Sequence, residues 1–323
     1  MPPEWVTKLP GFRARAELEE TRQRLTTAQA ERNALRTELD DGRKRLRAAK
    51  ADLKMAKAAL EVAGASADLG GGSLTGMATA LDAGRSPIAV RLDETLATRA
   101  DAYRSAAPFP HIVIDGFIDE RVLRTVVDEF SSADRRGWHH TEAEHERKSS
   151  TENEQPFGPF SRTLIHVLNA GPFVSFLEKL TGIEGLIADP HLRGGGFHEI
   201  RRGGKLGVHA DFNFYKRLGV YRRLNVIIYL NADWQDAWGG HLELWEKGAA
   251  APAARIAPIF NRAVIFDTSN SSYHGHPHPL ACPEHRSRQS IALYYYTVDY
   301  PYEDDRAAHT TIFIDTPEAP PTP

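Results

Sequence analysis

The most restrictive feature of this sequence is a succession of short apolar segments, each bounded by glycine, asparagine or proline. Between positions 194 and 298 they read GGGFHEI, KLGVHAD, LNVIIYLN, GGHLELWE, ARIAPIF, RAVIFDT and SIALYYYTV. Short segments rich in β-branched and aromatic residues, separated by turn residues, are typical of β-strands. Strands of this length at this spacing predict a β-sandwich or a β-barrel.

Helical patterns precede most of these strands. The segment DERVLRTVVDEF (119–130) has apolar residues at helical spacing, and Asp119 is suited to cap its N-terminus. The segment GPFVSFLEKLTG (171–182) is a second amphipathic helix, which Gly182 is expected to end. Because the helices come first, we expect them to pack on one face of the sheets, in an α+β, mainly β domain.

A leucine repeat of seven residues marks the N-terminal part of the chain, at Leu18, Leu25, Leu39, Leu46, Leu53 and Leu60. Arg32 takes the one missing step. The pattern predicts a coiled coil, or a helical hairpin if Gly42 breaks the helix. The alternative is a single solvated helix held by charge pairs four residues apart. We expect residues 12–63 to serve self-association or docking.

Composition divides the chain into four parts. Residues 1–63 form the helical or coiled-coil segment, and residues 64–86, rich in Gly, Ala and Ser, predict a flexible linker. Residues 87–315 have the mixed composition of a folded domain. Residues 316–323 are rich in proline and are expected to be disordered.

Charge and cysteine content narrow the class of protein. The formal net charge is only −3, so no overall field favours nucleic acid or acidic lipid as a partner. The single cysteine excludes an internal disulfide and fits a reducing compartment. No apolar run reaches the roughly 18 residues of a membrane helix, and the first residues lack a signal-peptide pattern. These features predict a cytoplasmic protein without a membrane span.

A candidate metal site lies in the strand-rich region. His209 and Asp211 stand two residues apart, which alone is a weak signal among 14 histidines. The apolar strand in RAVIFDTSNSSYHGHP then leads to His274. Two histidines and one carboxylate on adjacent strands form the facial triad of non-haem Fe(II) oxygenases, which leaves positions open for ligands. His276 and His278 are alternatives to His274, but each precedes a proline and lies further into the loop.

Together, His209-x-Asp211, His274 and Arg288-x-Ser290 resemble the iron(II)- and 2-oxoglutarate-dependent oxygenases, in particular their prolyl-4-hydroxylase-like branch. The stretch LNVIIYLNADWQDAWGGHLELW is similar to the same branch, and the resemblance covers residues 109–300. It implies a double-stranded β-helix (jelly-roll) core with flanking helices. It also implies Fe(II), 2-oxoglutarate and O2 as cofactors, with ascorbate as a possible reductant.

The co-substrate residues follow from the same comparison. Arg288 would grip the distal carboxylate of 2-oxoglutarate bidentately, and Ser290, on the same side of the strand, would add a hydroxyl donor. Arg286 is the alternative, more simply a solvated loop charge. On the LNVIIYL strand, Tyr229 would donate to the same carboxylate, unless it is an ordinary core aromatic, and Asn225 would reach the keto-acid end.

The predicted activity is hydroxylation of an unactivated C–H bond in a small-molecule, carrier-bound or peptidyl substrate, with release of succinate and CO2. Asp211 disfavours halogenation, because related halogenases have a small residue in its place. The alternative is a coiled-coil scaffold or sensor that uses the domain only to bind a metal and a 2-oxo acid. The candidates for substrate contact are His198, Asn213, Tyr215, His241 and Trp138, the last in a long polar loop (134–158) where ordinary packing is equally expected.

Overall fold

The computed structural model describes residues 96–301 and 307–316, together with eight helical residues between positions 21 and 32. The chain divides into two units, Met1–Gly76 and Met77–Pro323. The predicted coiled coil and linker lie outside the described residues apart from those eight, and so does the tail from residue 317. The proposed domain boundaries therefore stay predictions.

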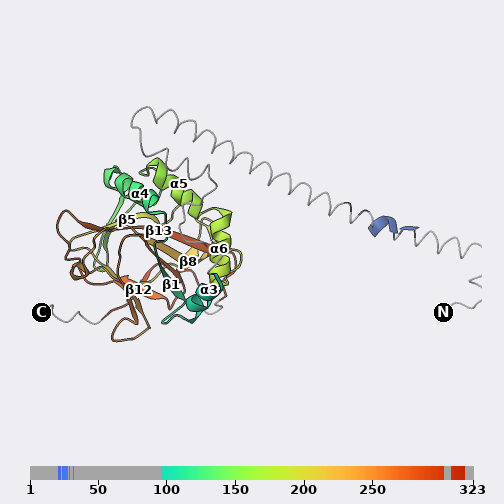
Figure 1. The fold of residues 1–323 in the computed structure, drawn as a ribbon. Coiled ribbons are helices and arrows are strands. Elements are labelled where there is room, and N and C mark those ends of the chain that lie inside the picture. Colours follow the sequence, from blue (N-terminus) through green and yellow to red (C-terminus); the bar gives the residue numbers. More distant parts are fainter. Residues whose placement is uncertain are drawn as a thin grey trace, which may run out of the picture. The chain divides into compact units, whose positions relative to one another are not determined.

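The described helices pack on the larger of two sheets, as expected from the sequence. They are α3 (Leu96–Ser105), α4 (Glu120–Ser132), α5 (Pro159–Leu168) and α6 (Gly171–Thr181), with a short 3₁₀ turn η2 (Asp236–Trp238). Helices α4, α5 and α6 lie along one side of the strands (Figure 1). Asp119 caps α4 through the backbone N–H groups of Arg121 and Val122, and Gly182 ends α6 with a left-handed φ of 76°. Both helix boundaries that the sequence predicted are confirmed.

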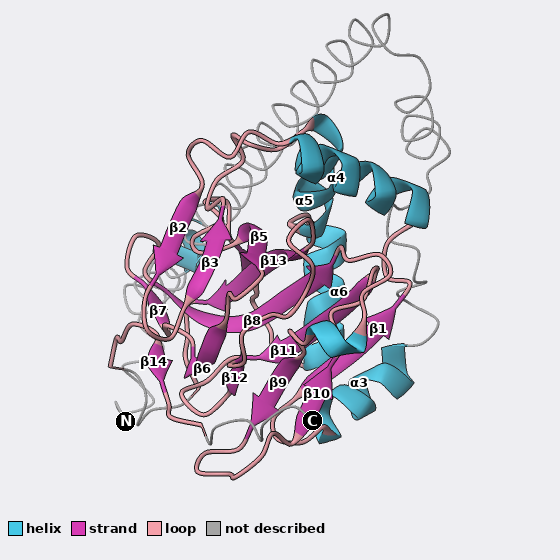
Figure 2. Cartoon of the chain, turned by 90° about the vertical axis from the view of Figure 1, so that its left-hand side faces the viewer, coloured by secondary structure: helices cyan, strands magenta, loops and turns pink. Residues whose placement is uncertain are grey.

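The larger sheet follows the order β1-β11-β8-β13-β5-β3-β2, with β4 on β13 and β7 on β8, and all its pairs are antiparallel (Figure 2). Its strands are β1 (His111–Asp115), β2 (His139–Glu142), β3 (Arg147–Ser150), β4 (Ile187–Ala188), β5 (Gly196–Arg201), β7 (Phe214–Tyr215), β8 (Val220–Tyr229), β11 (Arg262–Asp267) and β13 (Ser287–Thr297).

The smaller sheet has the order β10-β9-β12-β6-β14 and is also antiparallel. It comprises β6 (Leu206–Ala210), β9 (Leu242–Trp245), β10 (Ala254–Ile256), β12 (Tyr273–His276) and β14 (Ile312–Phe313). The two sheets enclose an apolar cluster drawn from both of them: Phe109, Tyr229, Leu242, Leu244, Ile256, Val264 and Phe266. Two packed antiparallel sheets agree with the expected jelly roll and confirm the mainly β class.

One prediction about the fold is wrong. The segment 134–158 was expected to be a long polar loop, but it contains the hairpin of β2 and β3. Its strand residues, HHTE and RKSS, include no apolar side chain; β2 is the edge of the sheet, and β3 lies between β2 and β5, with only two residues paired to β5. Without alternation of apolar and polar residues, the sequence carried no strand signal there.

Asn261 ties the start of the helical layer to the sheets. Its side chain accepts a hydrogen bond from the Ile118 backbone N–H (2.8 Å) and donates one to the Ile118 carbonyl (2.7 Å). The residue is buried and has a φ of 61°, a conformation that asparagine tolerates better than most residues. We expect Asn261→Ala to lower the free energy of unfolding by about 2–3 kcal/mol, because it leaves buried backbone groups unpaired. Urea unfolding of the full chain measures this, with the exposed Gln235→Ala as control; equal stability of both variants would contradict it.

None of the helices in the described part of the chain combines the length and apolar character that crossing a membrane requires.

Candidate metal centre

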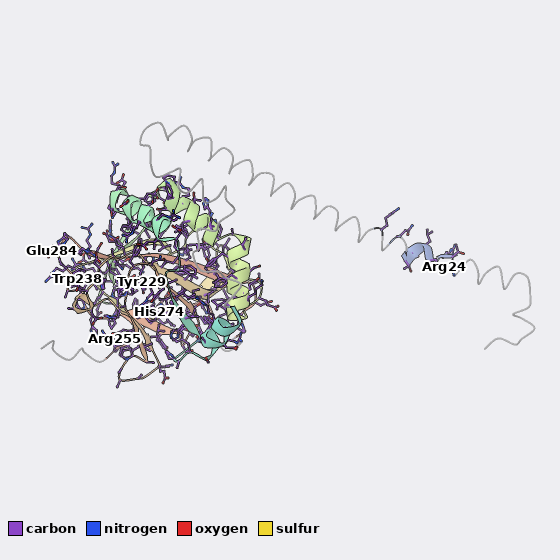
Figure 3. The ribbon with its side chains drawn as sticks, viewed as in Figure 1. Arg24, Tyr229, Trp238, Arg255, His274 and Glu284 are labelled. Carbon is purple, nitrogen blue, oxygen red and sulfur yellow. The ribbon has the colours of Figure 1, made fainter. Side chains whose placement is uncertain are left out.

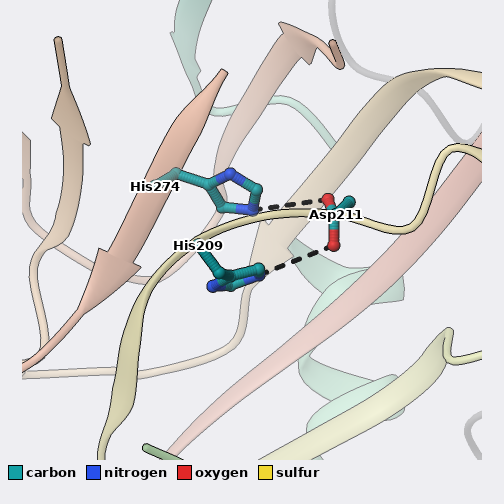
Figure 4. Close-up of side chains that lie close together, drawn as sticks. All are labelled: His209, Asp211 and His274. Carbon is teal, nitrogen blue, oxygen red and sulfur yellow. Dashed lines mark ion pairs between the residues drawn. The ribbon is translucent and has the colours of Figure 1, made fainter. Parts of the chain in front are cut away.

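The two histidines of the predicted triad face each other across neighbouring strands. β6 and β12 pair with His274 opposite His209, and the two ring centroids are 4.5 Å apart. Asp211 is the first residue after β6 (Figure 4). The strands approach closely because residue 275 is glycine: a Cβ there would lie 2.6 Å from the carbonyl oxygen of Gly207. One ligand atom from each of His209, Asp211 and His274 lies within 4.8 Å of the others.

Each imidazole is held by a backbone carbonyl of its own strand. His209 Nδ1 lies 2.8 Å from the Gly207 oxygen, and His274 Nδ1 lies 2.9 Å from the Ser272 oxygen. A carbonyl only accepts, so both Nδ1 atoms carry the proton and both Nε2 atoms keep a free lone pair. These Nε2 atoms lie 3.5 Å from Asp211, one from each carboxylate oxygen (Figure 4). The three side chains thus present unprotonated ligand atoms to one point.

The protonation states suit a divalent metal. Burial, followed by the proximity of His209, lowers the pKa of His274 to about 4, so this ring is neutral at pH 7. Burial would raise the pKa of Asp211, but the charged Arg222 beside it is the main cause that holds this pKa well below its usual value. Neutral imidazole and carboxylate with positions left open are the donor set of non-haem Fe(II) sites. The residues present therefore fit Fe(II).

Arg222 and Asn225 fix the Asp211 carboxylate. Arg222 Nη2 and Asn225 Nδ2 each donate to Asp211 Oδ2 at 2.9 Å. Arg222 also donates to Asn225 Oδ1 through Nε (3.0 Å) and Nη2 (2.8 Å), and its guanidinium carbon lies 3.4 Å from the centre of the Tyr294 ring. The Asn225 amide is engaged with Asp211 and Arg222, and the residue also lines the pocket beside the triad, so its predicted contact with the keto acid stays a prediction.

A β-bulge explains why the sequence did not reveal Arg222. Pairing of β8 with β13 runs from Tyr295 opposite Leu224 to Tyr296 opposite Arg222, so Arg223 is skipped. Simple alternation from Asn225 would place Arg223 on the site face, whereas the bulge turns Arg222 toward it. Nothing in the printed sequence marks the position of this bulge.

We expect Arg222→Met to weaken metal binding about 10- to 100-fold, the usual range for loss of a partner that orients a metal ligand. The physical reason is that Asp211 Oδ2 loses its charged donor. Titration of Mn(II) into the full chain measures the affinity, and the exposed Arg217→Met, in the loop between β7 and β8, is the matched control. Equal Mn(II) affinity in both variants would show that Arg222 does not act on the centre.

A pocket opens beside the triad, and Arg288 lies in its wall. Arg288 is only 5% exposed; its Nε donates to the Gly240 carbonyl (2.8 Å) and its Nη2 to the Tyr229 hydroxyl (3.1 Å). Among the described residues no carboxylate forms an ion pair with it. Burial lowers the pKa of Arg288, as expected for a guanidinium without a negative neighbour. The pocket therefore offers a fixed cation suited to an anionic ligand.

Of the two remaining predicted co-substrate residues, one lines the pocket and one does not. Ser290 lines the pocket two residues from Arg288, as expected. Tyr229 is not among the lining residues; its ring belongs to the cluster between the sheets, and its hydroxyl accepts from Arg288. Tyr229 and His274, both labelled in Figure 3, are buried. Tyr229 thus orients Arg288, and the direct carboxylate contact predicted for it has no support from the geometry.

Of the predicted substrate residues, His198 lines the pocket. Its Nε2 lies 2.9 Å from the Gly194 carbonyl and therefore carries the proton. Burial, followed by Lys148, lowers the pKa of His198 to about 3, so the ring is neutral and its Nδ1 is left as an acceptor. This prediction keeps its geometric basis.

The remaining four candidates lie outside the pocket lining. The Asn213 side chain holds the C-terminal segment, since it donates to the Ala307 carbonyl (2.9 Å) and accepts from the His309 N–H (2.9 Å). Tyr215 packs in a separate apolar cluster. His241 bonds Asp236 at 2.7 Å, and Trp138 packs edge-on against Phe130. Asn213 and Tyr215 are close in sequence to Asp211, but this closeness did not fix the direction of the chain beyond β6. The predicted substrate contacts of all four residues lack structural support.

Several lining residues escaped the sequence reasoning: Lys148, Leu206, Leu242 and Tyr294. Lys148 comes from β3, which the sequence did not reveal as a strand, and its Nζ pairs with Glu146 at 2.7 Å. His276 was considered only as an alternative metal ligand. In the structure it lines the pocket, while the ligand cluster contains His274.

Comparison with known families agrees with this geometry. Residues 195–296 match the 2OG-Fe(II) oxygenase superfamily. The matched segment contains His209, Asp211, His274, Arg288 and Ser290, so the resemblance that these motifs predicted is confirmed. This superfamily uses Fe(II), 2-oxoglutarate and O2, and the match supports a 2-oxoglutarate-dependent oxygenase.

Solved structures similar to this chain include a Pseudomonas putida prolyl-4-hydroxylase, at 15% identity and a TM-score of 0.46, covering 62% of this chain and 99% of that one. A Trichoplax adhaerens prolyl hydroxylase in complex with a hypoxia inducible factor peptide fragment has 17% identity and a TM-score of 0.45, with 67% and 92% covered. HygX from Streptomyces hygroscopicus, with nickel, 2-oxoglutarate and hygromycin B bound, has 12% identity and a TM-score of 0.41, with 64% and 92% covered. The comparison with curated proteins gave no match.

Proposed function

We propose that this chain is an Fe(II)/2-oxoglutarate-dependent dioxygenase that hydroxylates an unactivated C–H bond and releases succinate and CO2. One observation carries the proposal. Two imidazole Nε2 atoms and one carboxylate converge at a pocket that also holds a buried arginine, which forms no ion pair with any carboxylate of the described residues. A metal needs the first feature, and a 2-oxo acid with a second carboxylate needs both.

Each residue has a defined task in this proposal. His209, His274 and Asp211 hold the metal, with both rings oriented by backbone carbonyls and the carboxylate held by Arg222 and Asn225. Bound Fe(II), with 2-oxoglutarate and O2, supplies the oxidising chemistry that couples decarboxylation to oxygen insertion. The chain fixes the ligands beforehand, so little reorganisation is required on binding.

Arg288 and Ser290 would hold the distal carboxylate of 2-oxoglutarate. Tyr229 and Gly240 fix the guanidinium of Arg288, which lowers the entropy lost when the carboxylate binds. Ascorbate fits the proposal as an external reductant and needs no residue of its own. Asp211 occupies the position that a halide would need, which favours hydroxylation.

The substrate is a small molecule, a carrier-bound intermediate or a peptide. His198 and Lys148 lie on the wall formed by β5 and β3. With His198 Nδ1 as an acceptor and Lys148 as a donor, this wall suits a polar group of the substrate. Residues 12–63 are proposed to tether the enzyme to a second copy or to a larger assembly.

Coupled turnover tests the proposal. We expect the full chain, supplied with Fe(II) and 2-oxoglutarate, to consume O2 and form succinate in equal amounts. Pyruvate, which lacks the distal carboxylate, should support far less turnover. Binding of metal and 2-oxoglutarate without any O2 uptake, in the presence of reductant and candidate substrates, would instead favour a sensor or binding module.

A further inference from the structure

The side chain of His276 is buried without a partner. His276 ends β12, is 3% exposed, and neither ring nitrogen has a hydrogen-bond partner among the described residues. A buried polar group without a partner is costly and is uncommon in folded proteins. Since the ring lines the pocket beside the triad, a ligand in the pocket is the natural partner for it.

The strand pairing leads from the metal ligands through His276 toward the residue that anchors Arg288. His276 follows His274 by two residues, so both side chains project from the same face of β12, about 7 Å apart along the strand. In the ladder with β9, Gly275 pairs with Glu243, and the step to His276 leads toward Gly240. The carbonyl of Gly240 is the acceptor that anchors Arg288 Nε.

The lining of the pocket agrees with this position. His276 and Arg288 both line the pocket, so the ring and the guanidinium border the same space. A carboxylate held by Arg288 would accept a hydrogen bond from a ring N–H, and bonds to ionised acceptors are the stronger ones.

We propose that His276 binds the distal carboxylate of the 2-oxo acid together with Arg288, and thereby helps to select 2-oxoglutarate over shorter 2-oxo acids. This inference rests on the proposed function, because it requires a 2-oxo acid in the pocket. The role differs from metal ligation: the cluster of convergent ligand atoms contains His209, Asp211 and His274.

Calorimetric titration of the full-length chain loaded with Mn(II) tests the proposal, with 2-oxoglutarate and pyruvate as probes. We expect His276→Leu to weaken 2-oxoglutarate binding by about tenfold or more, as for one hydrogen bond to a charged group. Pyruvate binding and Mn(II) affinity should stay unchanged, because both involve the triad end of the pocket. His276→Gln keeps a donor and should retain most of the affinity. His278→Leu, at a part-exposed position outside the pocket lining, should behave as wild type.

Thermal unfolding adds a readout independent of turnover. Since leucine removes a buried polar group without a partner, the ligand-free His276→Leu chain should unfold at the same or a higher Tm than wild type. The rise in Tm on adding 2-oxoglutarate should be smaller in this variant. A purely structural role for His276 would give a lower Tm without ligand.

Two results would overturn this inference and leave the proposed function standing. The first is unchanged 2-oxoglutarate affinity in His276→Leu, as expected if only water occupies the site. The second is a loss of pyruvate and Mn(II) binding in this variant as large as its loss of 2-oxoglutarate binding. Failure of the Mn(II)-loaded wild type to bind 2-oxoglutarate would instead overturn the proposed function, and the inference with it. If His276→Leu does not fold, the variants His276→Asn and His276→Gln take its place. Wild-type affinity for 2-oxoglutarate in His276→Asn, together with loss of this affinity in His276→Gln, would also contradict the proposal.

Discussion

His209→Ala and His274→Ala are each expected to reduce O2 uptake and succinate formation to the uncatalysed background. Each variant removes one of the three proposed ligands in the described part of the chain, and each ring is oriented by a backbone carbonyl. Mn(II) titration should show the loss of metal affinity directly. The matched control is His278→Ala, a histidine four residues beyond His274 that lies outside the pocket lining.

Asp211→Ala should abolish turnover as well, but with an additional effect on stability. Removal of its carboxylate leaves Arg222 buried without its charged partner, which is strongly destabilising, by about 3–5 kcal/mol. The histidine variants leave this ion pair intact. Persistent decarboxylation of 2-oxoglutarate in folded His209→Ala and His274→Ala proteins would refute the ligand assignment.

Arg288→Leu is expected to raise the KM for 2-oxoglutarate about 100-fold, equivalent to about 3 kcal/mol of lost binding to a charged group. The guanidinium is the fixed cation of the pocket. Among the described residues it has no carboxylate partner, so the substitution breaks no ion pair within the protein. The KM of Arg288→Lys for 2-oxoglutarate should fall between those of the wild type and Arg288→Leu, because an ammonium keeps the charge but not the bidentate geometry. Steady-state kinetics at varied 2-oxoglutarate measure the effect.

Arg286→Leu is the matched control for Arg288. Arg286 stacks over Trp238 and donates to the Ala232 carbonyl, and it does not line the pocket. The KM of the Arg286→Leu variant for 2-oxoglutarate should therefore stay close to that of the wild type. A large rise in KM for Arg286→Leu with little change for Arg288→Leu would reverse the assignment of the two arginines.

The candidate ligands His209 and Asp211 could be proposed from sequence because they follow one another in and after an apolar segment, which forms β6. His274 was expected in the loop after the strand 262–267, but it lies in a separate strand, β12, of the smaller sheet. Only the pairing of β12 with β6 places the two histidines side by side. Arg288 and Ser290 followed from the alternation of a strand, which holds along β13 at that point.

Other parts of the site depend on features that local patterns do not carry. Arg222 reaches Asp211 because a bulge in β8 breaks the alternation, and Lys148 comes from β3, a strand without apolar residues. Asn213 follows the ligand Asp211 closely, yet the chain turns so that its amide holds the C-terminal segment. The pairing of distant strands and the course of loops decide these placements, and neither is encoded in neighbouring residues.

A crystal structure of the full chain grown without O2, in the presence of Mn(II) and 2-oxoglutarate, tests the central claim most directly. The account predicts Mn(II) bound by His209 Nε2, His274 Nε2 and the Asp211 carboxylate, with the distal carboxylate of 2-oxoglutarate on Arg288. Metal bound through His276 in place of His274, or 2-oxoglutarate bound away from Arg288, would contradict it.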